Sequence, residues 1–301
     1  MSWSRPIPTV TNSLGLFESV TKAMATNRER QKLVEALLAI GEQADDDIGL
    51  ADAGLLLAAL DDPDQKLDFY HRHLATLVAD VAARADQAPD ATAAAMALSE
   101  VLAGHHGYRG DSASYDDPAN ANLIRVIDRR RGLPVALGIL WLHAGRAAGF
   151  EIEGLSFPGH FLLRLRRGPD AVVLDPFNGG RVVAPADMRA MLNRIAGEEA
   201  LKPEHHRAVS AREILLRLLN NLKSRALQAG DADRAAEMLS RMVTVAPRHQ
   251  PSWRELALVR AHEGKLNDAI AALGRLVELA RTAEERREAE ALLAEIRSRL
   301  N

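Results

Sequence analysis

The sequence predicts an α+β fold followed by an all-α repeat region. Three observations carry this prediction. Between residues 28 and 104, apolar side chains recur at the spacing of amphipathic helices. Between residues 151 and 184 the apolar period shortens to two, which indicates a small antiparallel sheet. After residue 210 the sequence repeats itself with a period of about 34 residues, which indicates stacked helix pairs.

The composition is that of an ordinary globular protein, with 47% hydrophobic and 26% charged residues in a chain of 301 residues. The net charge is −3, and the C-terminal third lacks the concentrated basic patch of a nucleic-acid-binding surface, so we expect no nucleic-acid partner. The N-terminal segment "MSWSRPIPTVTNSLGLFESV" does not resemble a signal peptide, and the longest apolar run, "LPVALGILWLHAG", is too short to span a bilayer. We therefore expect a cytoplasmic protein with no membrane partner.

The first two thirds of the chain divide into an arm and a domain. Residues 1–27 are polar and contain prolines, which favours a loosely packed N-terminal arm, and residues 28–200 are predicted to form one domain with a helical N-terminal layer. Asn120 is expected to cap the helix that follows it. Pro134 suits the first turn of the next helix, "PVALGILWLHAGRAAG", which is apolar nearly all round at its start and is expected to be buried.

Four short strands are predicted after that helix, at "EIEGLSF", "HFLLRLR", "AVVLD" and "GRVV". The "NGG" at residues 178–180 is a strong turn signal between the last two. Consecutive short strands joined by tight turns favour antiparallel pairing.

Residues 210–301 are predicted to form a tetratricopeptide-repeat domain. The repeat superimposes Gly230 on Gly264, and two helix pairs followed by a closing helix at residues 283–300 are expected. Both glycines are expected where the two helices of a pair pack closely. Stacked pairs leave a concave face free, and a protein or peptide partner is expected there.

A histidine and an aspartate stand out in the predicted sheet. "FPGHFLLRL" places His160 in a strand-like run, and "AVVLDPFNGG" places Asp175 at the end of the next strand. On adjacent strands they can form the base and orienting carboxylate of a catalytic triad. The chain contains no cysteine, and Ser156 is not expected to replace it, because a mid-strand hydroxyl lacks the N–H groups of a helix start or sharp turn.

Residues 120–180 resemble the transglutaminase-like (papain-like) superfamily, in which a cysteine begins a buried helix and the next two strands supply a histidine and an aspartate. The stretch "GLPVALG" matches the cysteine motif with Pro134 at the cysteine position, while His160 and Asp175 match the other two. Taken with "RRRGLP", "FPGHF" and "DPFNGG", most of the chain is similar to the invasion-regulator SirB family. The resemblance implies a cysteine-less transglutaminase-like domain followed by tetratricopeptide repeats.

Three further residues are candidates for binding a small ligand in a cleft near His160. Arg131 lies at the start of the central helix, where it is either a solvated helix end or turns inward to pair with Asp175 or a ligand carboxylate. Tyr115 and Asn178 can reach the same cleft, although Asn178 is equally well explained as a turn residue.

No metal site and no cofactor are expected. His105 and His106 are neighbours in a predicted loop, and adjacent histidines there rarely converge on one ion. His71 and His73 are two apart on a helix and therefore face different sides. The "EHH" at residues 204–206 is loop-like.

Three functions remain open. The favoured hypothesis is a non-catalytic regulatory or binding protein, with a ligand cleft in its first domain and a partner on its repeats. The alternative is an enzyme, a hydrolase or transferase in which His160 is the general base, Asp175 orients it, and water or the substrate is the nucleophile. The third hypothesis is a plain adaptor whose first domain is purely structural.

The absence of cysteine generates a first prediction. Purified protein is expected to show neither amine transfer to glutamine nor peptide hydrolysis through an acyl-enzyme, because both need a nucleophile at the start of the central helix. Mass spectrometry after incubation with an acylating substrate analogue is the measurement, and a covalent acyl adduct on the chain would contradict the prediction.

Overall fold

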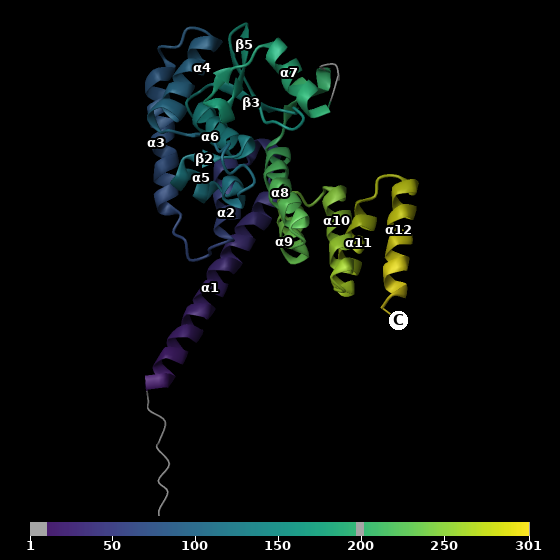
Figure 1. The fold of residues 1–301 in the computed structure, drawn as a ribbon. Coiled ribbons are helices and arrows are strands. Elements are labelled where there is room, and N and C mark those ends of the chain that lie inside the picture. The colour runs from purple at the N-terminus through teal and green to yellow at the C-terminus, as the bar shows by residue number, and fades with distance from the viewer. Residues whose placement is uncertain (1–10, 197–201, 301) are drawn as a thin grey trace, which may run out of the picture.

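The computed structural model describes residues 11–196 and 202–300 and has the predicted two parts, a mixed α/β body and a helical C-terminal region (Figure 1). One hydrophobic core runs from the first helix of the body into the repeats, so the two parts are packed together. Within the described residues, no helix is both long and apolar enough to cross a bilayer. The helices of the body are α1 (Thr11–Glu42), α2 (Leu50–Ala59), α3 (Asp68–Ala85), α4 (Ala91–Ser99), α5 (Leu123–Arg129), α6 (Pro134–Ala147) and α7 (Pro185–Ala196).

The first helix occupies part of the predicted arm. Residues 11–27 belong to α1, whose N-terminal part projects from the body in Figure 1. Residues 1–10 of the predicted arm lie outside the described residues.

Short turns of other helical types connect these elements. The turn η2 is a π-helix that continues α4 past Gly104. The 3-10 turns are η1 (Asp45–Asp47), η3 (Pro118–Ala121), η4 (Pro176–Asn178) and η5 (Pro203–His206), and η2 spans Glu100–His105.

The central helix α6 is buried as predicted. Its N-cap is Leu133, Pro134 occupies the first turn, and Trp141 is fully buried. Gly138 lets the sheet approach closely, because a Cβ there would lie 2.4 Å from the ring of Phe161. The helix therefore forms the layer on which the sheet and its loops are built.

The predicted cap of the preceding helix is wrong. The side chain of Asn122, rather than Asn120, accepts the N–H of Arg125 and caps α5. Asn120 belongs to the 3-10 turn η3, is fully buried, and donates from Nδ2 to the carbonyl of Ser114 at 2.6 Å. The turn delays the helix start by two residues, which periodicity alone does not show.

The sheet is antiparallel in the order β6-β5-β4-β3-β7. The four predicted strands are β3 to β6, and the sequence analysis missed β7, which pairs with β3 through Gly154 and Val209. A two-stranded parallel pair, β1 with β2, lies apart from this sheet. The strands are β1 (Arg109–Gly110), β2 (Arg131–Gly132), β3 (Glu151–Leu155), β4 (Leu163–Arg167), β5 (Asp170–Asp175), β6 (Arg181–Val182) and β7 (Ala208–Val209).

Besides α6, which contacts β3, the helices α4 and α7 pack against the sheet region. The helix α4 contacts β4, β5 and β6. On α7, Met188 and Leu192 join a second apolar cluster that includes Leu155 and Leu162 from the sheet region. This enclosure fixes the strand ends where the site residues lie.

The C-terminal region contains the two predicted helix pairs and the closing helix. The first pair is α8 with α9, the second is α10 with α11, and successive helices contact each other. Their bounds are α8 (Ala211–Gln228), α9 (Ala232–Val245), α10 (Gln250–His262), α11 (Leu266–Leu279) and α12 (Ala283–Ser298).

The predicted role of Gly230 and Gly264 in close packing is wrong. No atom lies within 4 Å of a Cβ built on either glycine, and their φ angles are +74° and +75°. Each follows the last turn of a helix and closes it, as where the N–H of Gly230 bonds the carbonyl of Leu227 and the N–H of Asp231 bonds that of Ala226. Both positions need glycine for the left-handed backbone.

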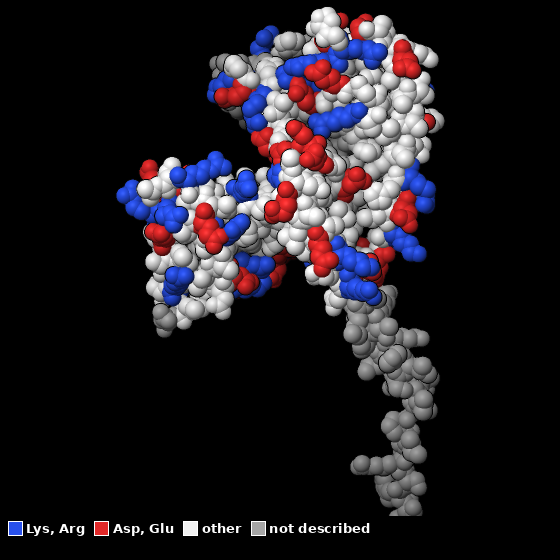
Figure 2. Space-filling model, turned by 180° about the vertical axis from the view of Figure 1, so that it is seen from behind, with Lys and Arg blue, Asp and Glu red and all other residues white. Residues whose placement is uncertain are grey.

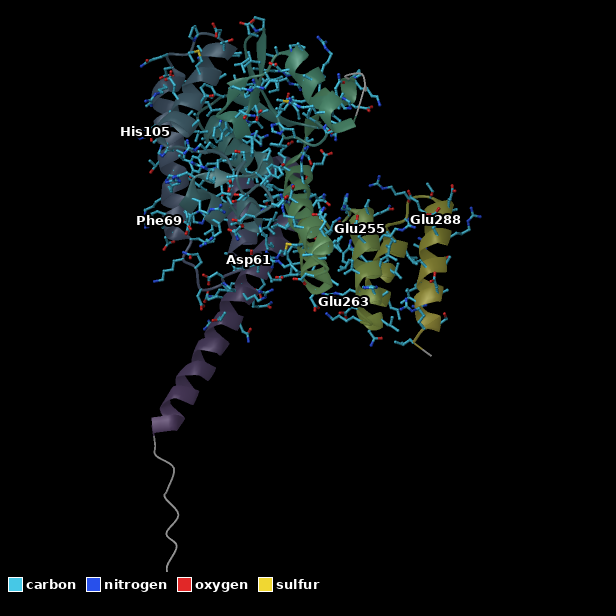
Figure 3. The ribbon with its side chains drawn as sticks, in the orientation of Figure 1. Asp61, Phe69, His105, Glu255, Glu263 and Glu288 are labelled. Atoms are coloured by element: carbon cyan, nitrogen blue, oxygen red, sulfur yellow. The ribbon has the colours of Figure 1, made fainter. Side chains whose placement is uncertain are left out.

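Buried charges join the body to the repeats. Arg241 of α9, only 4% exposed, donates to the carbonyl of Leu57 at 2.9 Å and to Asp61 and Glu237 at 2.6 Å each. Asp61 lies where the body meets the repeats (Figure 3) and also accepts from Arg234 at 3.0 Å. Burial alone would raise the pKa of Glu237, but Arg241 and Arg234 outweigh it and lower the pKa to about 2.

The glycine geometry predicts effects of opposite sign at two positions. Gly264→Ala should lower the free energy of unfolding by about 1–2 kcal/mol, because alanine is strained at positive φ. The matched control is Gly274→Ala inside α11, where a Cβ also meets no atom within 4 Å. There alanine should raise the free energy of unfolding by about 0.5–1 kcal/mol. Urea denaturation measures both, and a Gly264→Ala variant as stable as the wild type would refute the capping role.

Candidate functional site

Asp175 is the last residue of β5 and caps the turn η4. Its side chain is fully buried and accepts the N–H groups of Phe177 at 3.1 Å and Asn178 at 3.3 Å. The side-chain amide of Asn178 donates to the other carboxylate oxygen at 2.6 Å. These donors fix the carboxylate in one orientation.

His160 meets this carboxylate from a different kind of element than predicted. It lies in the bend between β3 and β4, not on a strand, because the chain turns at Pro158 and Gly159. Its Nε2 is 2.8 Å from Oδ1 of Asp175, its side chain is 17% exposed, and Nδ1 has no partner among the described residues. The structure therefore places together the predicted base and orienter, with one ring nitrogen left available.

The hydrogen bonds keep Asp175 ionised in spite of its burial. Burial alone would raise the pKa of the Asp175 carboxyl, but the bonds from His160 and Asn178 outweigh it, so that the pKa lies below its usual value. A charged carboxylate holds the imidazole in the tautomer that carries its proton on Nε2. This is the arrangement of a histidine base, whether or not it is used for chemistry.

No nucleophile stands at the start of the central helix. Pro134 is the first residue of α6 and is buried, and it has no side-chain group that can attack a substrate. Ser156 has no side-chain hydrogen bond to His160 among the described residues, so it is not activated by this base.

An aromatic row, missed in the sequence analysis, borders the pair. The ring of Phe177 lies 6.0 Å from that of His160 and 5.8 Å from that of Tyr115, both edge-on. Gly110 makes room for it, since a Cβ there would lie 2.5 Å from the Phe177 ring. Tyr115, 40% exposed, forms the outer end of the row.

The first repeat helix holds the loops of the site. Arg217 of α8 donates to the carbonyls of Phe157 at 2.8 Å and His160 at 2.5 Å. Its guanidinium also lies 5.5 Å from the ring centroid of Phe161. Burial lowers the pKa of the Arg217 guanidinium, and its hydrogen bonds to these neutral carbonyls do not offset this effect. No feature of the amphipathic pattern of α8 distinguishes this arginine.

A second arginine of α8 holds the Tyr115 side. Arg225 donates to the carbonyl of Tyr115 at 3.1 Å and lies 5.7 Å from its ring centroid. One continuous helix thus contacts both the His160 loop and the Tyr115 loop.

Arg131 does not pair with Asp175. Its Nη1 donates to the carbonyl of Arg130 at 3.1 Å, and β2 aligns it beside Arg109 of β1. In the same run, Arg129 forms an ion pair with Asp111 at 2.9 Å.

The comparisons with known proteins agree with this geometry. A model of the transglutaminase-like superfamily matches residues 68–220, and a tetratricopeptide-repeat model matches residues 222–294. The chain belongs to the transglutaminase-like superfamily. The border between the two matches falls inside α8, so this helix is shared between the superfamily domain and the repeats.

The relatives confirm the resemblance to the SirB family. A UPF0162 protein of Xylella fastidiosa is 30% identical over 244 residues, which cover 78% of this chain and 85% of that protein. A UPF0162 protein of Vibrio cholerae is 35% identical over 61% of this chain and 68% of that protein. Mouse F-box only protein 21 is 26% identical over 55% of this chain and 27% of that protein.

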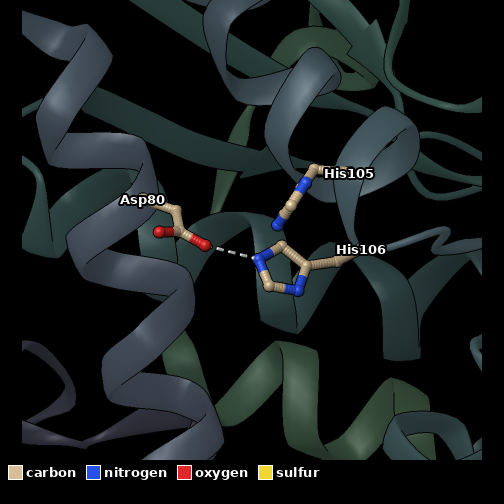
Figure 4. Close-up of side chains that lie close together, drawn as sticks. All are labelled: Asp80, His105 and His106. Atoms are coloured by element: carbon tan, nitrogen blue, oxygen red, sulfur yellow. Dashed lines mark hydrogen bonds and ion pairs between the residues drawn. The ribbon is translucent and has the colours of Figure 1, made fainter.

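A separate cluster of possible ligand atoms includes His105 and His106, for which no metal site was expected from the sequence. Asp80 of α3, remote in sequence, brings a third group, and one ligand atom from each of the three lies within 4.8 Å of the others (Figure 4). His71 and His73 do face different partners, as expected, since His71 contacts Asp52 at 3.2 Å and His73 contacts Tyr108 at 2.8 Å.

The Asp175 environment predicts a pH-dependent loss of stability. Asp175→Asn places amide hydrogens opposite the N–H donors and should cost about 1–3 kcal/mol of unfolding free energy at pH 7. Because the folded-state pKa lies below 3.8, the charge contributes stability above pH 3.8 and this contribution disappears as the pH falls through the folded-state value.

Urea unfolding at several pH values is the measurement, with the exposed Asp170→Asn on the same strand as the control. The difference between wild type and Asp175→Asn should narrow in acid. A constant difference would contradict the role of the charge.

Proposed function

We propose that this protein is a non-catalytic regulatory protein that binds a small ligand beside His160 and a protein or peptide partner on its repeats. The observation that carries the proposal is the combination of an intact His160–Asp175 pair with Pro134 at the start of α6. A polar pair kept in working geometry beside a helix start without a nucleophile is suited to recognition rather than acyl transfer.

The surroundings of His160 are suited to a small ligand with a polar and an aromatic part. The free Nδ1 supplies one hydrogen bond, and the rings of Phe177 and Tyr115 supply stacking area. Arg131 is half-buried at the start of the same helix region and stays our proposed partner for a ligand carboxylate. Asn178 already holds Asp175, so we assign it to positioning within the proposed site.

The enzyme alternative rests on the same pair. With Asp175 ionised and Nδ1 unoccupied, His160 could activate water or a substrate group without any thiol. Turnover that disappears in His160→Ala while binding persists would favour this alternative over the regulatory proposal.

The shared helix α8 supports coupling between the two proposed binding functions. Arg217 fixes the loop that carries His160, and α8 packs against α9 of the same repeat. A partner that shifts α8 would shift the carbonyls of that loop, and a ligand that orders the loop would favour one position of α8. Such coupling is reciprocal in binding free energy.

The ligand proposal is tested by a thermal-shift screen of metabolites and short peptides on the wild type. Compounds that raise the melting temperature of the wild type should no longer do so in His160→Ala. His71→Ala, which removes an exposed histidine that pairs with Asp52, is the matched control and should respond as the wild type does. Compounds that stabilise all three proteins equally would indicate that the His160–Asp175 pair has only a structural role, which would favour the adaptor hypothesis.

A substitution of Arg217 in α8 tests the positioning role. Arg217→Ala leaves the Phe157 and His160 carbonyls without their donor and should weaken binding of the same compounds, although Arg217 is not proposed to contact the ligand. Asn220→Ala, at an exposed position of the same helix, is the control. Equal losses in both variants would show a general effect of α8 rather than positioning of His160.

The partner proposal has a candidate surface where the repeats meet the end of α1. A cavity of about 590 Å³ there is lined by three arginines against two glutamates, and this basic excess favours an acidic peptide. The charged residues are Arg212, Arg248, Arg275, Glu42 and Glu213. Elsewhere the charges are mixed, and the face in Figure 2 shows basic and acidic side chains interspersed.

A peptide array provides the test of this surface. Acidic peptides should bind the wild type more strongly than neutral ones, and Arg248→Ala should weaken them. Arg254→Ala, whose arginine lies 4.0 Å from Glu288 outside this cavity, should not. Equal binding of neutral and acidic peptides would contradict the charge assignment.

A further inference from the structure

We propose that Asp80, His105 and His106 form a binding site for a divalent transition-metal ion, with Zn²⁺ as the best match. The three side chains come from two elements, α3 and the π-turn η2 with the residue that follows it. Figure 4 shows a ring nitrogen of His105 directed toward the space between the Asp80 carboxylate and the His106 ring. The site lies on the outer side of the body, away from the repeats (Figure 3).

The backbone of the π-turn brings the two histidines together. The N–H of His106 bonds the carbonyl of Val101 at 2.9 Å, five residues back, so the last turn is wider than an α-helical turn. The rings of His105 and His106 then lie edge to face with centroids 4.8 Å apart. π-turns are rare and occur often at functional sites, which agrees with this placement.

Asp80 approaches the histidines from α3. Its Oδ2 lies 2.8 Å from Nε2 of His106. His73 lies two helical turns before Asp80 on the same face of α3, and its ring centroid is 5.6 Å from that of His106.

The residue that follows α5 supports the wall behind the cluster. Arg130 has a φ of +56°, and no other non-glycine residue in the described part of the chain has a positive φ. Its guanidinium donates to the hydroxyl of Tyr108 and lies 2.7 Å from Nε2 of His73. Tyr108 and His73 are thereby fixed, and His106 packs against a rigid surface.

The distances require only a small adjustment to hold an ion. Two ligand atoms bound to one tetrahedral Zn²⁺ lie about 3.3 Å apart, since each bond is about 2.0–2.1 Å. The distance of 2.8 Å between Oδ2 of Asp80 and Nε2 of His106 must increase slightly. The ligand nitrogen of His105 now lies within 4.8 Å of the other two ligand atoms, and the exposed His105 ring must rotate to bring it closer. Exposure of His105 also leaves room for a water molecule as the fourth ligand.

The donor set decides which ion fits. Two imidazole nitrogens and one carboxylate oxygen favour Zn²⁺ and its late transition-metal neighbours over Mg²⁺ and Ca²⁺, which prefer oxygen ligands. A bound ion would link α3 to the segment that leads into β1, which carries Gly110 beneath Phe177. The proposed metal site is separate from the His160–Asp175 pair and does not depend on the proposed function.

The test is calorimetric titration of the full chain, with any histidine tag removed, with Zn²⁺. The wild type should bind one ion with a dissociation constant in the micromolar range or tighter, and Zn²⁺ should raise its melting temperature. His105→Ala removes an exposed ligand and should weaken binding at least tenfold. Asp80→Asn, on a different helix, should do the same, which keeps the test valid if one variant folds poorly.

The matched control is His71→Ala. His71 and Asp52 form a histidine–carboxylate pair at 3.2 Å on the same helix layer but belong to no group of three possible ligands in the described residues. Binding in this variant should equal that of the wild type. The proposal is overturned if the wild type shows no saturable binding at micromolar Zn²⁺, if His105→Ala and Asp80→Asn bind as tightly as the wild type, or if His71→Ala weakens binding equally.

Discussion

The site geometry depends on the two hydrogen bonds that Arg217 donates to the carbonyls of Phe157 and His160. The loop between β3 and β4 has no strand partner of its own, so its carbonyls need donors from elsewhere. Arg217 supplies them from α8, and the Phe161 ring beneath the guanidinium limits its freedom to move. With the loop held in this way, the ring of His160 meets the Asp175 carboxylate, and the carboxylate stays ionised although it is fully buried.

Close backbone approach is the second constraint on this region. Gly138 lets Phe161 lie directly on α6, and Gly110 lets Phe177 lie on β1. A side chain at either position would displace a ring and, with it, one wall of the site. Pro134 is also buried in this tightly packed region. It is tolerated at the start of α6 because the first turn of a helix does not need its N–H for an intrahelical bond. The body therefore keeps the shape of a transglutaminase-like site without a thiol.

The body and the repeats are connected by a continuous core and by charged groups rather than by a flexible linker. Arg241 and Asp61 meet across the junction, and the superfamily match ends and the repeat match begins within α8. A helix that belongs to both parts makes their positions interdependent. This connection is the physical basis for the proposed coupling between the body and the repeats.

The sequence by itself determined the α+β body, the buried central helix, the four main strands, the repeat pairs and the pairing of His160 with Asp175. These features follow from local periodicity, turn residues and a motif, all of which act over a few residues. The role of Gly230 was also within reach of the sequence, because glycine just after a helix is a capping signal as well as a packing one.

Only the tertiary structure decided which distant residues meet. Arg217 lies 57 positions from His160, and Asp80 lies 26 positions from His106. No sequence pattern distinguishes Arg217 or Asp80 from the solvent-exposed charged residues around them. The path of α8 along the His160 loop and the packing of α3 beside the π-turn create these contacts, and such packing depends on the whole core rather than on any local pattern.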